Sequence, residues 1–310
     1  DVWSGNLAYL ALGFTLKSPI NEVLDRAKSP WKYGMGLALT PGTLVGYNVQ
    51  TEDERNDLGV GAVQSTFTGS GGTYRFTWSN AVKYKNTAFG ANLGWAFGKT
   101  KYENTTTFTD DPTSNVDTFR QIFYQNNYRD EIAMNGFVWK LGVQHDFVLA
   151  TSESDKETPT KWITLGLNGE GSHKINTVTD KYRIRSRGIL STGQYLDADT
   201  ILQSNNLHQT ITLPASFTLG FQFVKANKLK IGAQFGLENW ANYDNEVRPE
   251  TLRNTFSVSG GVEYTPDYIS YNRFMKKVRY RLGAYFRQDP RTVGGKNFND
   301  TGLTFGFGFP

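Results

Sequence analysis

The sequence of 310 residues contains no cysteine and no run of eighteen apolar residues. Without cysteine there is no disulfide framework and no thiolate-ligated metal site. Without such a run, a transmembrane α-helix is excluded. The mean hydropathy of −0.48 does not exclude a transmembrane β-barrel, because only half of the residues in each of its strands face lipid.

Signals for chemistry are also scarce. The three histidines, His145, His173 and His208, lie far apart, so we expect no metal site and no cofactor. No Gly-x-Ser-x-Gly elbow and no glycine-rich phosphate loop occurs, so we do not expect an enzyme. The net charge of +4 comes without a basic cluster interleaved with stacking aromatics, which argues against nucleic-acid binding.

Glycine and aromatic residues are abundant, and they follow a two-residue period. Between Leu207 and Phe223, apolar side chains occupy all of the odd positions except Gln209, and small polar ones most of the even positions. Because side chains alternate across a strand, this pattern places the apolar set on one face throughout the stretch. Such a length exceeds the usual five to six residues and is typical of a strand that crosses lipid.

The same pattern recurs along the chain and predicts about eleven strands. They are 7–16, 31–47, 62–85, 87–98, 133–147, 162–187, 207–223, 229–240, 256–264, 278–287 and 303–309. A soluble sandwich or closed barrel is the alternative, but it would have to pack all of the large aromatics into one small interior. We therefore predict an all-β fold: a transmembrane antiparallel β-barrel with long external loops, forming a single domain over residues 1–310.

The last strand but one sets the orientation of the barrel wall. Its odd positions include Arg279, Arg281 and Arg287, and an arginine facing lipid costs about 2–4 kcal/mol near the midplane. We therefore expect these arginines to face the lumen, either as electrostatic infill or as an anchor for a substrate carboxylate. Val278, Leu282 and Phe286 would then face the acyl chains.

Loops and strand ends complete the topology. Trp31, Trp162 and Trp240 stand at strand ends and are expected in the aromatic girdles at the membrane surfaces. Outer-membrane barrels have short periplasmic turns and long external loops. We therefore expect turns at 85–86 and 226–227 in the periplasm. The segments 19–30, 151–161 and 264–276 would lie on the same side, and the loops 99–131, 188–206 and 241–252 outside.

Proline and glycine interrupt the second strand at Pro41-Gly42. Proline removes a donor from the ladder, so we expect a kink or lost pairing there. Bacterial single-chain barrels have an even number of strands. A count of about eleven therefore leads us to expect that terminal strands are missing from the sequence.

The ordered pattern resembles the outer-membrane long-chain fatty-acid transporter family. Four segments carry the likeness: WKYGMGLALTPGTLVGY (31–47), GGTYRFTWSNAVKYKNTAFGANLGWAFG (71–98), TITLPASFTLGFQFVKANKLKIGAQFGLENWANY (210–243) and residues 256–310. The resemblance implies a fourteen-stranded barrel with an N-terminal plug, from which hydrophobic substrates leave sideways through a gap at a kinked strand. It would place that gap at Thr40, Pro41, Gly42 and Thr43. The plug and the terminal strands would lie outside this sequence.

These observations lead to two functional hypotheses. The first is passive uptake of hydrophobic molecules such as long-chain fatty acids across the outer membrane, with Arg279, Arg281 and Arg287 binding substrate. The partners would be outer-membrane lipid and a hydrophobic small molecule. The alternative is a non-transporting accessory barrel in an outer-membrane secretion or assembly complex. An open apolar pocket would favour transport, and a lumen filled by side chains would favour the alternative.

Overall fold

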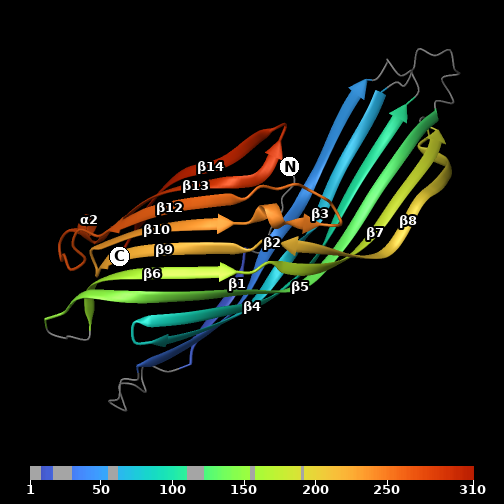
Figure 1. The fold of residues 1–310 in the computed structure, drawn as a ribbon. Helices are drawn as coiled ribbons and strands as arrows, with labels where there is room; N and C mark the ends of the chain where they lie inside the picture. The colour runs from blue at the N-terminus through green and yellow to red at the C-terminus, as the bar shows by residue number, and fades with distance from the viewer. Residues whose placement is uncertain (1–7, 17–29, 55–61, 110–121, 154–157, 190–191) are drawn as a thin grey trace.

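A computed structural model describes residues 8–16, 30–54, 62–109, 122–153, 158–189 and 192–310. They form one antiparallel sheet with eleven strands along its main order and three further strands, β7, β8 and β11, that branch from it at β5 (Figure 1). The strands are β1 Leu10–Thr15, β2 Trp31–Glu54, β3 Ala62–Tyr84, β4 Thr87–Thr109, β5 Ile122–Thr151, β6 Pro159–Glu170, β7 His173–Ile189, β8 Gln194–Leu213, β9 Ser216–Lys225, β10 Leu229–Glu238, β11 Asp244–Asn245, β12 Thr255–Tyr264, β13 Arg279–Val293 and β14 Lys296–Gly308.

The predicted all-β, antiparallel architecture is confirmed. The order along the sheet is β1-β2-β3-β4-β5-β6-β9-β10-β12-β13-β14, so most strands pair with their neighbours in sequence. Strands β1 and β14 form the two edges, and within the described residues they do not pair with each other. The structure therefore shows an open sheet and not the closed barrel of the prediction.

Helical structure in the described residues is restricted to two short segments, the 3-10 turn η3 Trp240–Asn242 and the helix α2 Phe274–Lys277. No helix in the described part of the chain is long and apolar enough to cross a membrane. The β3–β4 connection is a two-residue turn in which Lys85 has φ of 51°. At the β9–β10 turn Asn227 has φ of 59°. Both predicted short turns are therefore present.

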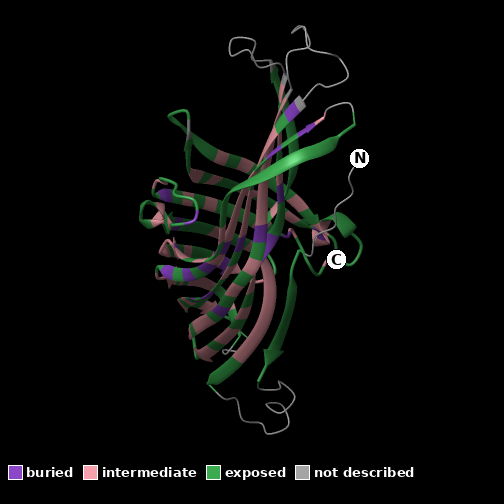
Figure 2. Ribbon diagram, turned by 90° about the vertical axis from the view of Figure 1, so that its right-hand side faces the viewer, coloured by how far each residue is buried: buried purple, intermediate pink, exposed green. Residues whose placement is uncertain are grey.

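The cross-strand register gathers the apolar side chains on one side of the sheet, which we call the outer face. A row of paired residues runs along it from β4 to β13: Phe89, Val143, Leu167, Leu219, Phe235, Val258 and Phe286. The inner face carries Thr164, Gln222, Gly232, Gly261, Gly283 and Thr304 in the corresponding row. On the outer face Phe305 is 82% exposed and Leu282 64% exposed. Figure 2 shows the resulting alternation along the strands, with few buried residues.

Six strands continue far beyond the others, and this part of the sheet is visible in Figure 1 as the long arrows of β2, β3, β4, β5, β7 and β8. We call it the extension; it comprises 44–54, 62–72, 99–109, 122–135, 173–189 and 194–213. The sequence-based prediction of loops at 99–131 and 188–206 is therefore wrong over most of their length. Only 110–121 and 190–191 of these loops lie outside the described residues.

The extension meets the rest of the sheet at a line of irregularities that we call the crease. The extension is the part above the crease, and the rest of the sheet is the part below it. Strand β2 shifts register between Pro41 and Leu44. Strand β5 pairs with β6 up to Leu141–Gly169 and with β7 from Asn135–Asn176. Between these two pairs the chain of β5 covers six residues and the facing chain of β6 and β7 covers seven, so one extra residue forms a bulge. Strands β8 and β9 are likewise separated by Pro214-Ala215, where proline cannot donate to the ladder.

The crease corrects the prediction for 207–223. The apolar positions of β9, such as Leu219, lie on the outer face, but Ile211 of β8 lies on the inner face. There Ile211 packs with Val138 and Ile175 in a small buried core, joined by Ala96, Met134, Leu213 and Tyr243. One face therefore does not remain apolar throughout, because the extra residue at the crease reverses which parity faces outward.

Polarity changes at the same line. On the outer face, β4 carries Phe89, Leu93 and Phe97 below the crease and then Lys99, Lys101 and Glu103 above it. On the inner face, small residues below the crease give way to tyrosines above it, with Tyr102 on β4 and Tyr128 on β5. The two parts of the sheet are therefore built for different surroundings.

Candidate functional site

The inner face below the crease is hollowed into a groove of about 820 Å³. Strands β6, β9, β10, β12, β13 and β14 line it, mostly with glycine, threonine, serine and glutamine. Three charged side chains meet within it. Glu263 Oε1 lies 3.0 Å from Lys230 Nζ, and its Oε2 accepts a hydrogen bond of 2.7 Å from Arg281 Nε.

The register places the three predicted arginines on one face, as their spacing indicated. Arg281 lines the groove, Arg287 pairs with Asp300 at 3.0 Å, and Arg279 lies opposite Gly308 on β14. The acidic partners Glu263 and Asp300 were not foreseen, because only the strand register brings them to these arginines. Two of the three arginines are thus neutralised by carboxylates, which is the arrangement expected of electrostatic infill.

The expected lipid-facing position of Val278 is wrong. Val278 follows α2, before β13 begins, and is only 1% exposed. Leu282 and Phe286 do lie on the outer face, together with Val262 and Val258 of β12. The alternation that begins at Arg279 therefore cannot be continued back through the end of α2.

A second ion cluster lies on the inner face near the short turns. Lys83 Nζ of β3 lies 2.5 Å from Asp146 Oδ2 of β5, and Thr164 Oγ1 of β6 donates to Asp146 Oδ1 at 2.7 Å. Like the Lys230–Glu263–Arg281 cluster, it pairs charges across neighbouring strands. The inner face below the crease is therefore a polar surface with internally compensated ions, unlike an apolar substrate pocket.

The predicted interruption at Pro41 is confirmed as a register shift in the β2–β3 pairing. The hydroxyl of Thr73 accepts a hydrogen bond of 2.9 Å from the backbone N–H of Thr43, and Thr40 Oγ1 donates to the carbonyl of Arg75 at 3.4 Å. A β-carbon on Gly42 would lie 2.7 Å from Thr73 Oγ1. The strand thus passes Thr40 to Thr43 as a bulge bridged by side chains.

The aromatic girdle differs from the prediction. Trp31 lies on the outer face at the start of β2, beside Tyr84 with 4.5 Å between ring centroids. Trp162 shares the inner face of β6 with Thr164, and Trp240 lies in η3. The outward tyrosines at the ends of other strands, Tyr264 and Tyr280, were not predicted, because the sequence-based girdle contained tryptophan alone.

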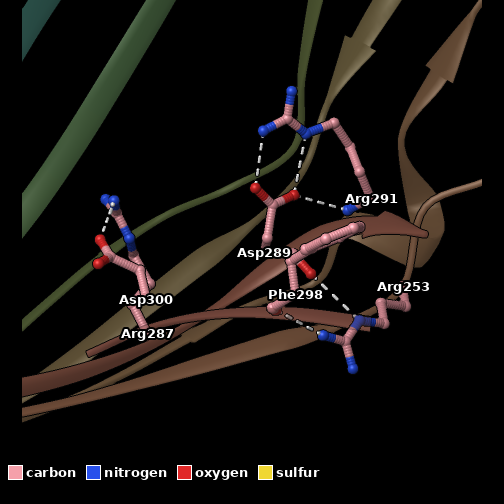
Figure 3. A network of polar contacts seen from close by, with 6 residues as sticks. All are labelled: Arg253, Arg287, Asp289, Arg291, Phe298 and Asp300. Carbon is pink, nitrogen blue, oxygen red and sulfur yellow. Dashed lines mark hydrogen bonds and ion pairs between the residues drawn. The ribbon is translucent and has the colours of Figure 1, made fainter. Parts of the chain in front are cut away.

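Ionic networks lie on the strands beyond the apolar rows. On the outer face of the extension, Lys99 and Arg129 both pair with Glu131, and their hydrogen bonds lower the pKa of Glu131 to about 2. Figure 3 shows a second network near the β13–β14 hairpin. There Arg291 makes two hydrogen bonds to the Asp289 carboxylate, at 3.0 and 2.7 Å, and they lower the pKa of Asp289 to about 2.

Arg253 ties the segment before β12 to this hairpin. It donates to the backbone carbonyls of Asp289 and Phe298, at 3.1 and 3.2 Å (Figure 3). Among the residues that the structure describes, no group of three or more histidine, aspartate or glutamate side chains is placed to hold a metal ion. The charged clusters pair ions across strands, as Lys83 does with Asp146, or along one strand, as Arg291 does with Asp289.

Comparison with protein-family models places the chain in a family. A family model described as BamG, a family associated with the Bam complex of the outer membrane, matches residues 5–310. No curated protein matches the chain. The match corrects the resemblance to fatty-acid transporters, because alternating, glycine-rich strands are a requirement of outer-membrane barrels in general and not of one family. The lateral exit at Thr40 to Thr43 depended on that resemblance and loses its support.

Proposed function

The chain belongs to the BamG family, and from this premise we propose that it is a non-transporting accessory subunit of the outer-membrane Bam assembly complex. The observation that carries the proposal is a match extending over residues 5–310. The role is that of a binding scaffold and not of an enzyme. It agrees with the inner face, where two of the arginines expected to bind substrate are paired with carboxylates.

The sheet below the crease would be the wall of a multi-pass barrel in the outer membrane. Its outer face presents large apolar side chains on strand after strand, which would meet lipid. The arginines of β13 point to the other face, avoiding a cost of about 2–4 kcal/mol each. Closure of the barrel belongs to this proposal, because the edges β1 and β14 do not pair with each other within the described residues.

The extension would stand outside the bilayer. Its outer face carries lysine, arginine, glutamate, asparagine and threonine where the same strands below the crease carry phenylalanine and leucine. Since short turns of outer-membrane barrels are periplasmic, the opposite end of β3 and β4 would be external. The extension is then the part of the molecule that soluble portions of a neighbouring subunit can reach.

Purification of the complex tests the role. A tagged copy expressed at its native level should co-purify with the Bam subunits after detergent extraction. Depletion of the protein should leave newly made outer-membrane barrels unassembled, while uptake of a long-chain fatty acid per assembled transporter stays unchanged. Co-purification with no Bam subunit, or a loss of fatty-acid uptake without an assembly defect, would contradict the proposal.

A further inference from the structure

A small pocket of about 370 Å³ lies on the inner face of the extension, away from the groove below the crease. Neighbouring strands bring its residues together through the pairs Phe67–Asn104, Asn104–Tyr128 and Tyr128–Arg183. The side chains that matter here are Tyr47, Phe67, Tyr102, Tyr128, Arg183 and Arg248. Arg248 comes from the segment after β11, which therefore reaches across the sheet as far as Tyr102 of β4.

That segment is held in place by its own hydrogen bonds and by one apolar anchor. The Asn245 Oδ1 atom accepts from the backbone N–H groups of Val247 and Arg248, at 3.0 and 3.1 Å. Asn245 Nδ2 in turn donates to the hydroxyl of Tyr243 at 2.8 Å, and Val247 is only 7% exposed. The turn thus presents Arg248 in one position, with its guanidinium 3.9 Å from the centre of the Tyr102 ring.

The two arginines of the pocket differ in how their charge is compensated. Arg183 donates to Asp130 Oδ1 at 2.8 Å and lies 5.2 Å from the centre of the Tyr128 ring. Glu103, although it borders the pocket, accepts from Asn127 and pairs with Lys101 on the outer face. In the described part of the chain the Arg248 guanidinium has no carboxylate or other hydrogen-bond partner. The pocket therefore holds one uncompensated cation.

Within the residues described, the pocket also contains one hydrogen-bond acceptor without a partner, which can pair with a backbone N–H of an incoming segment but not with a carboxylate. The Asn104 Oδ1 atom is shielded from solvent and has no partner among the described residues. Tyrosines surround it on a part of the molecule whose opposite face is strongly polar. Tyrosine and arginine are the residues enriched at the centres of protein interfaces, where they supply large contact area and directed hydrogen bonds.

We propose that this pocket receives a carboxylate side chain from a segment of a partner subunit. The inference rests on the proposed function for the existence of that partner. The carboxylate would take both N–H groups of one edge of the Arg248 guanidinium, a geometry that lysine cannot reproduce. The tyrosine rings would cover the segment on either side, and the preorganised turn at Asn245 would reduce the entropy lost on binding.

Site-specific photo-crosslinking in the intact complex tests the contact. A benzophenone amino acid at Tyr47, on the pocket side of β2, should crosslink to a Bam subunit through a peptide that contains aspartate or glutamate. The same probe at Asn48, the next residue on the opposite face, is the matched control and should not reach that peptide. Arg248→Glu should lower the Tyr47 crosslink at least roughly tenfold, and Arg248→Lys should lower it less.

Two further readouts separate a local contact from misfolding and from failure of the function. Arg248→Glu should keep the heat-modifiable migration of the unaltered protein. Reversing the charge of the crosslinked acidic residue on the partner should restore the crosslink to Arg248→Glu. An unchanged crosslink in Arg248→Glu, or a Tyr47 crosslink only to glycolipid or to this same chain, overturns the inference while co-purification with Bam subunits still stands. Loss of that co-purification in the unaltered protein would instead overturn the proposed function.

Discussion

An arginine placed on either face of β9 distinguishes lipid from water as the surroundings of the sheet. Leu219 lies on the outer face and is 49% exposed, between Leu167 and Phe235. The apolar positions of this strand run from Phe217 to Phe223, a span of about 20 Å at 3.4 Å per residue. At the tilt of about 35–45° of barrel strands, this span covers about 15 Å of the apolar band of about 25 Å, with Leu219 near its centre.

Leu219→Arg should therefore carry nearly the full midplane penalty of about 2–4 kcal/mol. At 1.4 kcal/mol per factor of ten, the unfolding equilibrium would shift by roughly 30-fold to 700-fold. Thr218→Arg is the matched control. Thr218 lines an inner-face groove of about 320 Å³ beside Asn168 and Gln234, where a guanidinium reaches water and polar groups. We expect that variant to change stability by less than about 1 kcal/mol.

The assay is guanidinium titration of each variant refolded into lipid vesicles, followed by tryptophan fluorescence and extrapolated linearly. Leu219→Ala measures the loss of packing alone, so that the excess cost of Leu219→Arg over Leu219→Ala reports the charge. If Thr218→Arg is as destabilising as Leu219→Arg, or if Leu219→Arg costs no more than Leu219→Ala, the outer face does not meet lipid and the proposed orientation of the sheet in the membrane is wrong.

Three further changes probe the crease and the extension. Gly71 has φ of +101°, and a β-carbon there would lie 2.3 Å from a backbone oxygen. Gly71→Ala should therefore lower the free energy of unfolding by at least about 2 kcal/mol. The control Gly46→Ala, in open space, should lower it by less than about 1 kcal/mol. Because the pKa of Glu131 is lowered to about 2, its contribution is present above its ordinary pKa near 4.5 and is lost as pH falls towards 2; the stability difference between the unaltered protein and Glu131→Gln should shrink over that window in denaturant titrations. Since the chain has no cysteine, Gln50→Cys should react with an impermeant maleimide on intact cells and Asn86→Cys should not; the reverse would invert the topology.

The strands below the crease were predicted well from the sequence, because an apolar face opposite a polar face imposes a two-residue period that is visible without any alignment. For β9, β10, β12, β13 and β14 the apolar parity matches the outer face. Residues 99–131 were mistaken for a loop because both faces of an extended strand in water can be polar, and the period then disappears. Pro214 carried the signal for the break in 207–223, but the reversal of faces there depends on an extra residue in the β6–β7 line.

The site was only partly predictable. Spacing alone placed Arg279, Arg281 and Arg287 on one face, since alternation is a local property. Their partners Glu263 and Asp300 are set by the register between strands, which alternation does not determine. Arg248 gave no signal at all, because its role depends on a turn that folds back across β7 and β5 to reach Tyr102.

At the bulge at Gly42, the number of residues in β2 decides which face of the sheet the following side chains occupy. Two residues of β2 stand opposite Thr73 there, so deleting one would remove the bulge, leave Leu44 opposite Gly72 and keep Tyr47 on the inner face. Deleting two would instead shift the segment from Leu44 to Glu54 by one position and carry its side chains to the opposite faces of the sheet. Among natural relatives, loss of one residue at this point should therefore be tolerated and loss of two should not, whereas the hairpin ends can vary by any number.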